Sequence, residues 1–325
     1  MPAIDVKNLT KIYSVFQKEP GFSGTIKSLF RRKYQKIKAL EDISFEIKEG
    51  ELVGFIGPNG AGKTTTLKCL SGLLYPTSGQ ISVLGYRPWQ RQENFLKEIA
   101  FVMGQKNQLW WELPPMETFL LNKEIYDIPQ SQFKKALADL TQLLSVGDIV
   151  NTPTKKLSLG QRMKCELIAS LLHSPQVLFL DEPTIGLDVV MQSKLREFIG
   201  EYNRKFGATI ILTSHYMGDV QALCRRVIII SVGQIIFDGQ LSKLVQKYAP
   251  YKLISLVLQK ETEVSQILSF GEIKFIDFPR VALKVSSKDV KITATRILKE
   301  LPVEDLNIED ADIEEVIRDV FGNKG

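Results

Sequence analysis

Long apolar runs are missing from this sequence of 325 residues. Runs such as residues 227–230 are far shorter than the roughly 20 apolar residues that a membrane-spanning helix needs. The first residues, MPAIDVKNLTKIY, also lack the basic and then apolar pattern of a secretory signal peptide. We therefore expect a protein that does not span a membrane, is not exported and stays in the cytoplasm.

Cysteine is scarce, and the sequence has no low-complexity segment. The three cysteines, Cys69, Cys165 and Cys224, are odd in number and have no metal-ligand spacing, so we expect reduced thiols that serve as small apolar side chains. With 44% hydrophobic and 24% charged residues, the composition is that of a globular protein. A chain of this length predicts a large domain with a smaller one attached.

The first 242 residues alternate between strand and helix patterns. Residues 3–9 and 43–47 alternate as antiparallel strands do, whereas residues 51–56 form an apolar strand that leads through glycines into a helix at 64–73. Further strands are expected at 80–84, 99–103, 177–180, 209–213 and 227–232, with a mostly helical segment over 116–174. The later apolar runs, separated by helices, predict a parallel sheet.

The pattern changes after residue 242. We expect strand 253–258, helix 263–268, strands 273–278 and 281–285, helix 290–301, and then an acidic stretch. This order predicts a small α+β domain over 243–325. The acidic residues are either a solvated face or a surface that pairs across a dimer or regulates turnover; they are Glu304, Asp305, Glu309, Asp310, Asp312, Glu314 and Glu315.

The segment GPNGAGKTT at residues 57–65 matches the phosphate-binding loop, because it follows an apolar strand and opens a helix. Its glycines let backbone N–H groups turn toward phosphate oxygens, and the helix N-terminus adds a positive potential. Lys63 is expected to reach the β and γ phosphates of ATP, and the Thr64 hydroxyl to bind Mg²⁺. The expected nucleotide contacts in this loop are Gly57, Pro58, Asn59, Gly60, Ala61, Gly62, Lys63, Thr64 and Thr65.

Two adjacent carboxylates, Asp181 and Glu182, end the buried strand that begins at Val177. Apolar packing does not favour them there. At the carboxyl edge of the sheet, beside the phosphate loop, Asp181 is placed to hold Mg²⁺ and Glu182 to activate an attacking water.

Further motifs follow in order: LSLGQ at 157–161, VLFLDEPT at 177–184, IGLD at 185–188 and TSH at 213–215. Together with GPNGAGKTT they resemble the ATP-binding subunits of ABC transporters over roughly the first 240 residues. The resemblance implies an α/β fold, a P-loop NTPase of the ABC type with an antiparallel β subdomain and a helical subdomain at about 105–174. Leu159 replaces the usual signature glycine.

The resemblance also assigns residues outside the phosphate loop. It implies that Ser158, Gly160 and Gln161 act on the nucleotide bound by a second subunit, and that Asp188 crosses the dimer interface. Two more catalytic contacts come from the same source. Gln105 touches Mg²⁺ and senses the membrane partner, and His215 contacts the γ-phosphate.

Tyr13 resembles the aromatic residue that stacks on adenine. It either does so or is a packing residue, with Phe16 or Tyr34 as substitutes, because a long insertion follows it. Trp110 and Trp111 are either core aromatics or part of a groove for a membrane partner.

The implied function is ATP hydrolysis that powers transport, in the export direction by the IGLD form and the C-terminal extension. The implied partners are integral membrane permease subunits and a second ATP-binding subunit, identical or paralogous, so the chain is expected at the inner face of the cell membrane. A rival function is a soluble ABC ATPase that acts on the ribosome or nucleic acid. Such proteins usually carry two ATPase domains or a long coiled coil, neither of which is present here, and we expect no nucleic-acid partner.

The net charge of +5 is concentrated in an insertion over residues 14–38, which contains seven basic residues and a single acidic residue, Glu19. Within residues 26–38, apolar residues recur at spacings of three and four, which predicts an amphipathic helix. We expect it to dock at the membrane surface or on the membrane partner. The alternative is a solvated basic face over the ATPase core.

Overall fold

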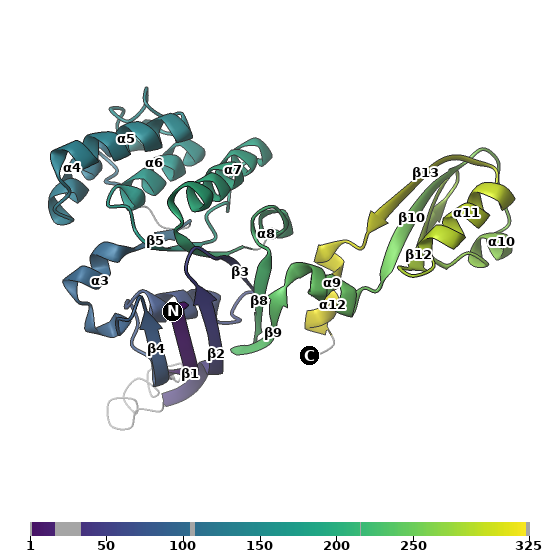
Figure 1. Ribbon diagram of the computed structural model, residues 1–325, viewed down its shortest axis with the longest axis horizontal. Helices are drawn as coiled ribbons and strands as arrows, with labels where there is room; N and C mark the ends of the chain where they lie inside the picture. Colours follow the sequence, from purple (N-terminus) through teal and green to yellow (C-terminus); the bar gives the residue numbers. More distant parts are fainter. Residues whose placement is uncertain (1, 17–33, 105–107, 215, 323–325) are drawn as a thin grey trace, which may run out of the picture. The chain divides into compact units, whose positions relative to one another are not determined.

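The computed structural model describes residues 2–16, 34–104, 108–214 and 216–322 (Figure 1). It divides into two compact units, residues 1–238 and 239–325, where the sequence predicted domains of residues 1–242 and 243–325. Within the described part of the chain, no helix has both the length and the apolar content needed to cross a membrane.

A six-stranded sheet with the order β5-β6-β7-β3-β8-β9 forms the centre of the first unit. β3 runs parallel to both β7 and β8, and β6 runs parallel to both β5 and β7. The predicted parallel sheet is therefore confirmed. The strands are β3 (Leu52–Ile56), β5 (Ile99–Met103), β6 (Val177–Asp181), β7 (Thr209–Thr213), β8 (Arg226–Ser231) and β9 (Gln234–Gln240).

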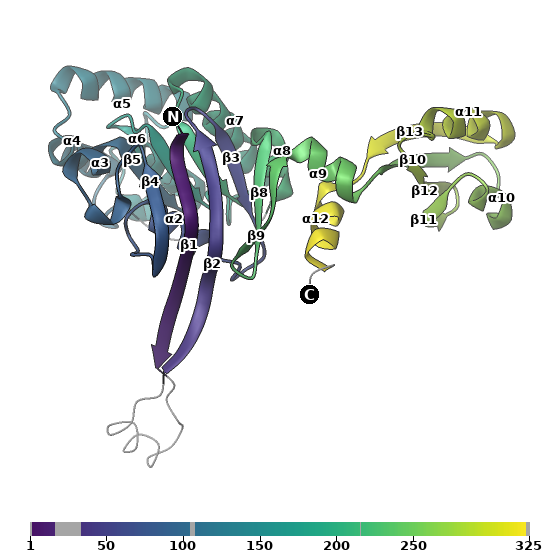
Figure 2. The same ribbon diagram turned by 60° about the horizontal axis from the view of Figure 1, so that its bottom comes forward.

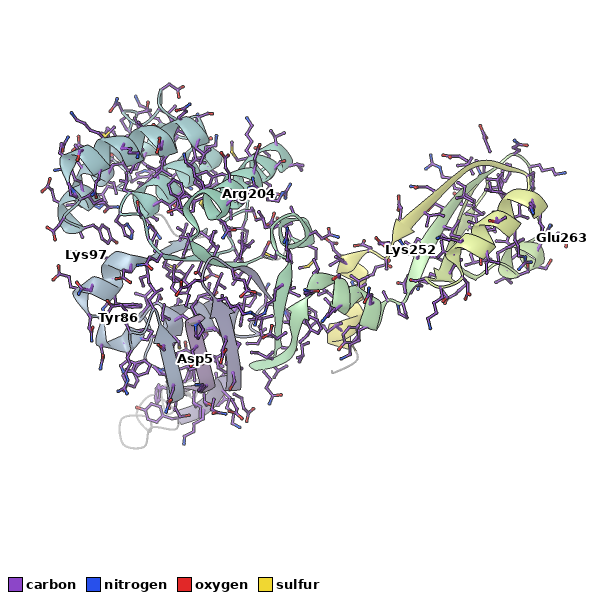
Figure 3. All side chains as sticks on the ribbon, viewed as in Figure 1. Asp5, Tyr86, Lys97, Arg204, Lys252 and Glu263 are labelled. Carbon is purple, nitrogen blue, oxygen red and sulfur yellow. The ribbon has the colours of Figure 1, made fainter. Side chains whose placement is uncertain are left out.

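A second, three-stranded sheet has the order β2-β1-β4 and consists of β1 (Pro2–Phe16), β2 (Tyr34–Lys48) and β4 (Ser78–Val83). Both neighbours of β1 are antiparallel to it, with Ile4 opposite Ile47 on one side and Val83 on the other. Side chains fill the space between this sheet and the six-stranded one (Figure 3).

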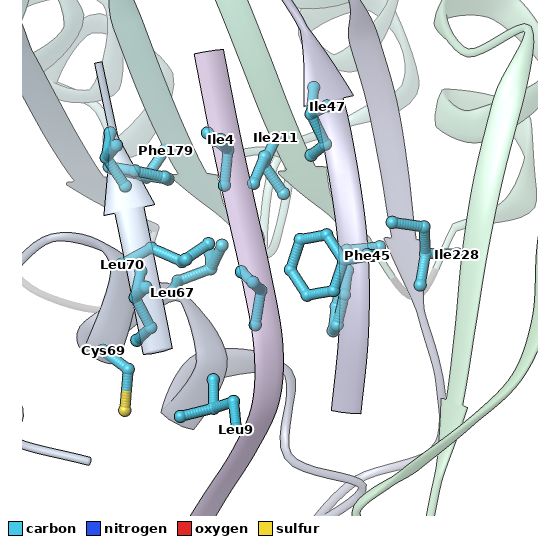
Figure 4. Packing of buried hydrophobic residues seen from close by; sticks show 14 of the residues in the cluster. Ile4, Leu9, Phe45, Ile47, Leu67, Cys69, Leu70, Phe179, Ile211 and Ile228 are labelled. Atoms are coloured by element: carbon cyan, nitrogen blue, oxygen red, sulfur yellow. The ribbon is translucent and has the colours of Figure 1, made fainter. Parts of the chain in front are cut away.

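The core of the first unit joins three layers. Ile4 and Phe45 come from the antiparallel sheet, Leu67 from α2 (Lys63–Leu70), and Phe179 and Ile211 from the parallel sheet (Figure 4). All five side chains are at most 5% exposed. This packing holds α2, and with it the phosphate loop, between the two sheets.

β1 and β2 continue beyond β4 as a two-stranded ribbon (Figure 2). Tyr13 lies opposite Ile37, and Phe16 lies opposite Tyr34. The predicted amphipathic helix over residues 26–38 is therefore wrong for residues 34–38, which pair with β1 as a strand. Cross-strand pairing decided the conformation there, and the spacing of apolar residues could not reveal it. Residues 17–33 lie outside the described residues.

Helices surround the parallel sheet. The predicted helical segment contains α4 (Pro115–Ile125), α5 (Gln130–Leu144) and α6 (Leu159–Leu171), and both α4 and α5 contact α6. α2 ends at Leu70, three residues earlier than expected, and Gly72 follows in the left-handed region with φ 73°. The remaining helices in the described part of this unit are α3 (Glu93–Glu98), α7 (Val189–Phe206), α8 (Met217–Leu223) and the single 3-10 turns Pro88–Gln90 and Thr154–Lys156.

The three cysteines are buried and free, as expected. Burial raises the pKa of Cys69 to about 11 and that of Cys165 to about 12. At neutral pH these side chains are therefore protonated thiols that pack as apolar groups.

The second unit is a four-stranded antiparallel sheet with the order β11-β12-β10-β13. Alternate residues of β10 and β12, such as Ile254 and Leu283, pack against Ile267 of α10 and Ile297 of α11. The elements are α9 (Leu241–Tyr248), β10 (Tyr251–Leu258), α10 (Val264–Leu268), β11 (Glu272–Asp277), β12 (Arg280–Ser286), α11 (Val290–Glu300), β13 (Val303–Asp310) and α12 (Ile313–Gly322).

The acidic stretch is structured, which the sequence pattern did not predict. It forms β13, which pairs with β10, and α12, which contacts α9 through a buried side of Val316, Ile317 and Val320. Glu315 is half-buried and pairs with Lys274 at 2.7 Å. The other six acidic side chains are exposed, as a solvated face would be.

Candidate functional site

The loop between β3 and α2 is held tightly by its surroundings. A Cβ atom on Gly57 would lie 2.2 Å from the carbonyl oxygen of Ile230, and one on Gly62 would lie 2.6 Å from Leu40 Cδ2. Gly62, with φ 111°, is also the N-cap of α2 and provides no side-chain cap. The first backbone N–H groups of a helix have no intrahelical partner, so they are available to an anion at this point.

Lys63 lies within this loop. Its Nζ atom donates hydrogen bonds to the carbonyl oxygens of Gly57 (2.6 Å) and Pro58 (3.1 Å), and the side chain is 5% exposed. Burial lowers the pKa of Lys63, and the charges of Glu182 and Asp181 oppose that change. A buried ammonium next to neutral carbonyl groups is stabilised by a polyanion such as a nucleotide phosphate chain.

Asp181, the last residue of β6, connects the loop to the neighbouring strands. Its Oδ2 atom accepts a hydrogen bond from Thr64 Oγ1 (2.8 Å), and its Oδ1 atom accepts one from Thr213 Oγ1 (2.7 Å). A hydroxyl and a carboxylate in contact are hard oxygen donors of the kind that Mg²⁺ prefers. The donor set of Thr64 and Asp181 therefore fits Mg²⁺.

Glu182 has an unusual backbone. Its φ of 54° lies in the left-handed region, which costs a residue other than glycine on the order of 1 kcal/mol. Its amide donates to Thr213 Oγ1 (3.0 Å) and to the Thr213 carbonyl oxygen (3.1 Å). Gly104 lies so close that a Cβ atom there would be 2.1 Å from the Glu182 carbonyl oxygen. These contacts fix the backbone conformation of Glu182, the residue that follows Asp181.

Gln105 and His215 lie outside the described residues. Residues shortly before them are described: the Gly104 amide donates to the Asp181 carbonyl oxygen (2.9 Å), and Thr213, two residues before His215, contacts Asp181 through its hydroxyl. Thr213 was not among the site residues predicted from the sequence. Its position at the carboxyl end of a strand, inside the TSH motif, was the available signal.

Ser158, Gly160, Gln161 and Asp188 form a second group, around the first turns of α6 and α7. Ser158 caps α6 in a capping box with Gln161, through Gln161 N to Ser158 Oγ (3.2 Å) and Ser158 N to Gln161 Oε1 (3.0 Å). Asp188 caps α7 by accepting from Met191 N (2.9 Å). A Cβ atom on Gly160 would lie 2.8 Å from Met191 Cγ, so the start of α6 packs closely against the Met191 side chain at the start of α7.

Tyr13 is half-buried on the ribbon, with Lys11 Nζ 5.3 Å from its ring centroid. Phe16 and Tyr34, the two substitutes considered for it, form an edge-to-face pair with ring centroids 6.0 Å apart. They are 36% and 56% exposed.

Trp110 and Trp111 are 58% and 49% exposed, so their interpretation as core aromatics is wrong. The Arg162 guanidinium lies 5.5 Å from the Trp111 ring centroid. Backbone hydrogen bonds from Lys155 to Trp111 and from Thr154 to Leu113, both 3.0 Å, hold the segment. These bonds attach it to the residues just before the signature, and the rings remain open to solvent.

The family model for ABC transporters matches residues 40–185. The ABC transporter ATP-binding protein NatA of Bacillus subtilis (strain 168) is 34% identical over 215 residues, which are 66% of this chain and 87% of NatA. This chain belongs to the ABC transporter family. It is an ATP-binding chain that hydrolyses ATP, and its fold is that of a P-loop NTPase of the ABC type.

Other relatives match a larger part of this ABC ATPase. The linearmycin resistance ATP-binding protein LnrL of Bacillus subtilis (strain 168) is 29% identical over 289 residues, 88% of this chain and 92% of LnrL. The teichoic acids export ATP-binding protein TagH of Listeria monocytogenes serotype 4b (strain F2365) is 33% identical over 248 residues, 75% of this chain and 69% of TagH. Residues 250–309 match the C-terminal domain of EvrA-like ABC transporters.

Two solved structures share the fold. An ATP-binding subunit of an ABC transporter is 27% identical, with a TM-score of 0.62 over 76% of this chain and 93% of its own. An ATP-binding cassette in a dimeric post-hydrolysis state with ADP and Pi is 23% identical, with a TM-score of 0.60 over 73% of this chain and 98% of its own. At that identity the second structure supports the fold alone.

Proposed function

We propose that this ABC ATPase is the motor subunit of an export-type transporter. It hydrolyses MgATP at a site shared between two ATP-binding subunits and drives separate membrane-spanning subunits. The observation that carries the proposal is the group at the carboxyl edge of the parallel sheet. There, Thr64 and Asp181 are hydrogen-bonded to each other, and Glu182 follows in a fixed backbone conformation. The names of LnrL and TagH, with resistance in one and export in the other, support the transport class and its direction.

In this mechanism, Lys63 and the first amides of α2 bind the phosphate chain. Thr64 and Asp181 would hold Mg²⁺, and the bound ion would neutralise the charge of the phosphate oxygens. The Glu182 carboxylate orients the attacking water and accepts its proton. Gln105 and His215 complete this group by resemblance, as the Mg²⁺ contact and the γ-phosphate contact.

The second group, with Ser158, Gly160, Gln161 and Asp188, serves the nucleotide of the other subunit. Its capped α6 N-terminus is at least partly open: the Leu159 side chain is 37% exposed. An exposed helix N-terminus suits a phosphate that is supplied by a partner. Tyr13 is assigned to the adenine ring, and the ribbon that carries it leads into the basic insertion, which we assign to docking at the membrane or its permease.

Exposed apolar side chains support the proposal of a membrane-spanning partner. Large exposed apolar side chains cluster in sequence between residues 110 and 125; they are Trp110, Trp111, Leu120, Leu121 and Ile125. Exposed apolar patches of this kind mark protein-protein contacts. The surface follows directly after the Gln105 segment, so a docked permease would be linked to the Mg²⁺ contact.

The test is Glu182→Gln, which removes the base and keeps the metal ligands. We expect it to bind MgATP, to hydrolyse it at least about a hundredfold more slowly, and to accumulate a dimer with trapped nucleotide. Light scattering with MgATP measures the dimer, and Lys63→Ala is the control that should not form it. Wild-type turnover in Glu182→Gln, or a monomer at every protein concentration, would contradict the shared-site mechanism.

A further inference from the structure

Asp219, on α8, is a fully buried carboxylate that the mechanism above does not use. It is 0% exposed. Its Oδ2 atom accepts hydrogen bonds from Thr184 Oγ1 (2.5 Å) and Ser214 Oγ (2.7 Å), and its Oδ1 atom accepts one from Arg196 NH1 (2.9 Å). A buried charge is stable only when it is paired and hydrogen-bonded. Asp219 meets this requirement with donors from three separate segments.

Each of these segments carries a residue of the proposed site. Thr184 stands two residues after Glu182, and Ser214 stands immediately before His215. Arg196 lies on α7, whose first turn Asp188 caps. One carboxylate therefore binds three segments that carry the proposed base, the proposed γ-phosphate contact and the residue assigned to the dimer interface.

The donors are themselves part of tight local structure. Thr184 is 2% exposed and accepts, through its carbonyl oxygen, a hydrogen bond from Leu187 N (3.2 Å). Ser214 is 1% exposed, and its Oγ atom accepts from Tyr216 N (3.0 Å). Movement of Asp219 would therefore move Ser214 and the turn after Glu182 together. Glu182 has a left-handed backbone, and such a conformation persists only when its surroundings maintain it.

We infer that Asp219 is a positioning residue: it holds the segment after Glu182, Ser214 and α7 in the one arrangement that supports hydrolysis. It touches neither nucleotide nor metal. The inference rests on the proposed function, because it takes Glu182 as the base. It predicts a defect in the hydrolysis step with little change in nucleotide binding, since Lys63 and Thr64 have no contact with this cluster in the hydrogen bonds described above.

The experiment compares Asp219→Asn with Asp238→Asn in the full-length chain. Asp238 pairs with Arg226 at 2.7 Å on β9, so its substitution also removes one partner of an ion pair, but away from the three segments. We expect kcat of Asp219→Asn to fall between about tenfold and a hundredfold, because small misplacements of catalytic groups cost this much. We expect its KM for ATP to stay within about threefold. Asp238→Asn should keep the wild-type kcat.

Two milder variants keep the carboxylate in case Asp219→Asn folds poorly. Thr184→Val removes one hydroxyl donor at nearly constant volume, and Arg196→Lys keeps the positive charge but shortens its reach. Both should lower kcat with an unchanged KM, and Arg196→Lys should lower it less than Arg196→Ala. Unfolding temperatures are measured for every variant. A lower unfolding temperature with wild-type kcat in Asp219→Asn, Thr184→Val and Arg196→Lys would overturn the inference and leave Asp219 a stabilising residue only.

The outcome separates this inference from the proposed function. If Glu182→Gln is inactive and Asp219→Asn is normal, only the positioning role fails. If Glu182→Gln hydrolyses ATP like the wild type, the assignment of the base fails. The kcat of Asp219→Asn is then compared with that of the wild type alone. In that case a normal Asp219→Asn again overturns the positioning role.

Discussion

The two units differ in what they bury. Among the described residues of the first unit, six of the twelve buried polar side chains lie at or next to the carboxyl edge of the parallel sheet; they are Lys63, Asp181, Thr184, Thr213, Ser214 and Asp219. Among the described residues of the second unit, Thr293 is the one buried polar side chain. The ion pairs of the second unit, such as Lys252 with Asp310 at 2.8 Å, lie largely at its surface. Burying polar groups is costly, so their concentration marks where chemistry rather than packing determined the residues.

We therefore expect catalysis to reside in the first unit, and the apolar core of the second unit to stabilise its own fold. A core change in the second unit that alters turnover would contradict this expectation, and so would a finding that the polar edge of the first unit is dispensable.

The largest expected effect comes from Lys63→Ala. The variant removes the buried ammonium of the phosphate loop, and we expect ATPase activity to fall about a hundredfold or more. Lys68→Ala, on the same helix outside the loop, is the matched control and should keep its activity. Steady-state phosphate release measures both. Equal rates for Lys63→Ala and the wild type would remove the loop from the site.

A core substitution in the second unit tests its independence. Leu283 is 0% exposed in the cluster that β10 and β12 form with α10 and α11. Leu283→Ala should destabilise this unit by about 2–5 kcal/mol, seen as a lower unfolding temperature in calorimetry, with ATPase activity unchanged. Ile292→Ala, at a site 67% exposed, is the control with little effect. A clear loss of turnover in Leu283→Ala would show that the second unit regulates the first.

Glu166, on α6, gives a smaller effect that depends on pH. It is 2% exposed, and burial raises its pKa to about 7, while the Gln108 amide (3.3 Å) and Arg162 act in the opposite direction. The folded state therefore binds a proton that the unfolded state has released between about pH 4.5 and 7. Stability should then fall as pH rises through this window and level off above it.

Between pH 5.5 and 8 we expect the wild type to lose on the order of 1–2 kcal/mol of its free energy of unfolding through this group. Glu166→Gln should lose less over the same range. Denaturant unfolding at several pH values measures the difference, and Glu197→Gln, an exposed position on α7, is the control. If the free energy of unfolding depends on pH in the same way in Glu166→Gln and in the wild type, Glu166 is not the cause of the pH dependence.

The predicted phosphate loop shows why local motifs are readable. GPNGAGKTT requires only a strand before it and a helix after it, and both are encoded within about twenty residues by apolar patterning. The contact between Thr64 and Asp181 was predictable for a related reason. Asp181 ends one parallel strand, and Thr64 belongs to the phosphate-loop segment that follows another.

The ribbon and the acidic stretch show where such reasoning fails. Apolar spacing over residues 26–38 fitted a helix, but residues 34–38 pair with β1, and a strand pairing depends on a partner far along the chain. β13 was missed because its acidic composition is unusual for a strand, yet β10 supplies the hydrogen bonds that order it.

The phosphate loop, the two carboxylates after Val177 and the signature could be predicted from the sequence alone, and with them the family, because each is a short segment whose chemistry depends on neighbours in the chain. The Asp219 cluster required the folded structure, because its partners Thr184 and Arg196 are 35 and 23 residues away from it. The folded structure also decided the exposure of Trp110 and Trp111. The physical reason is the same in both cases: burial and hydrogen bonding between distant segments depend on how strands and helices pack, and no local pattern records that packing.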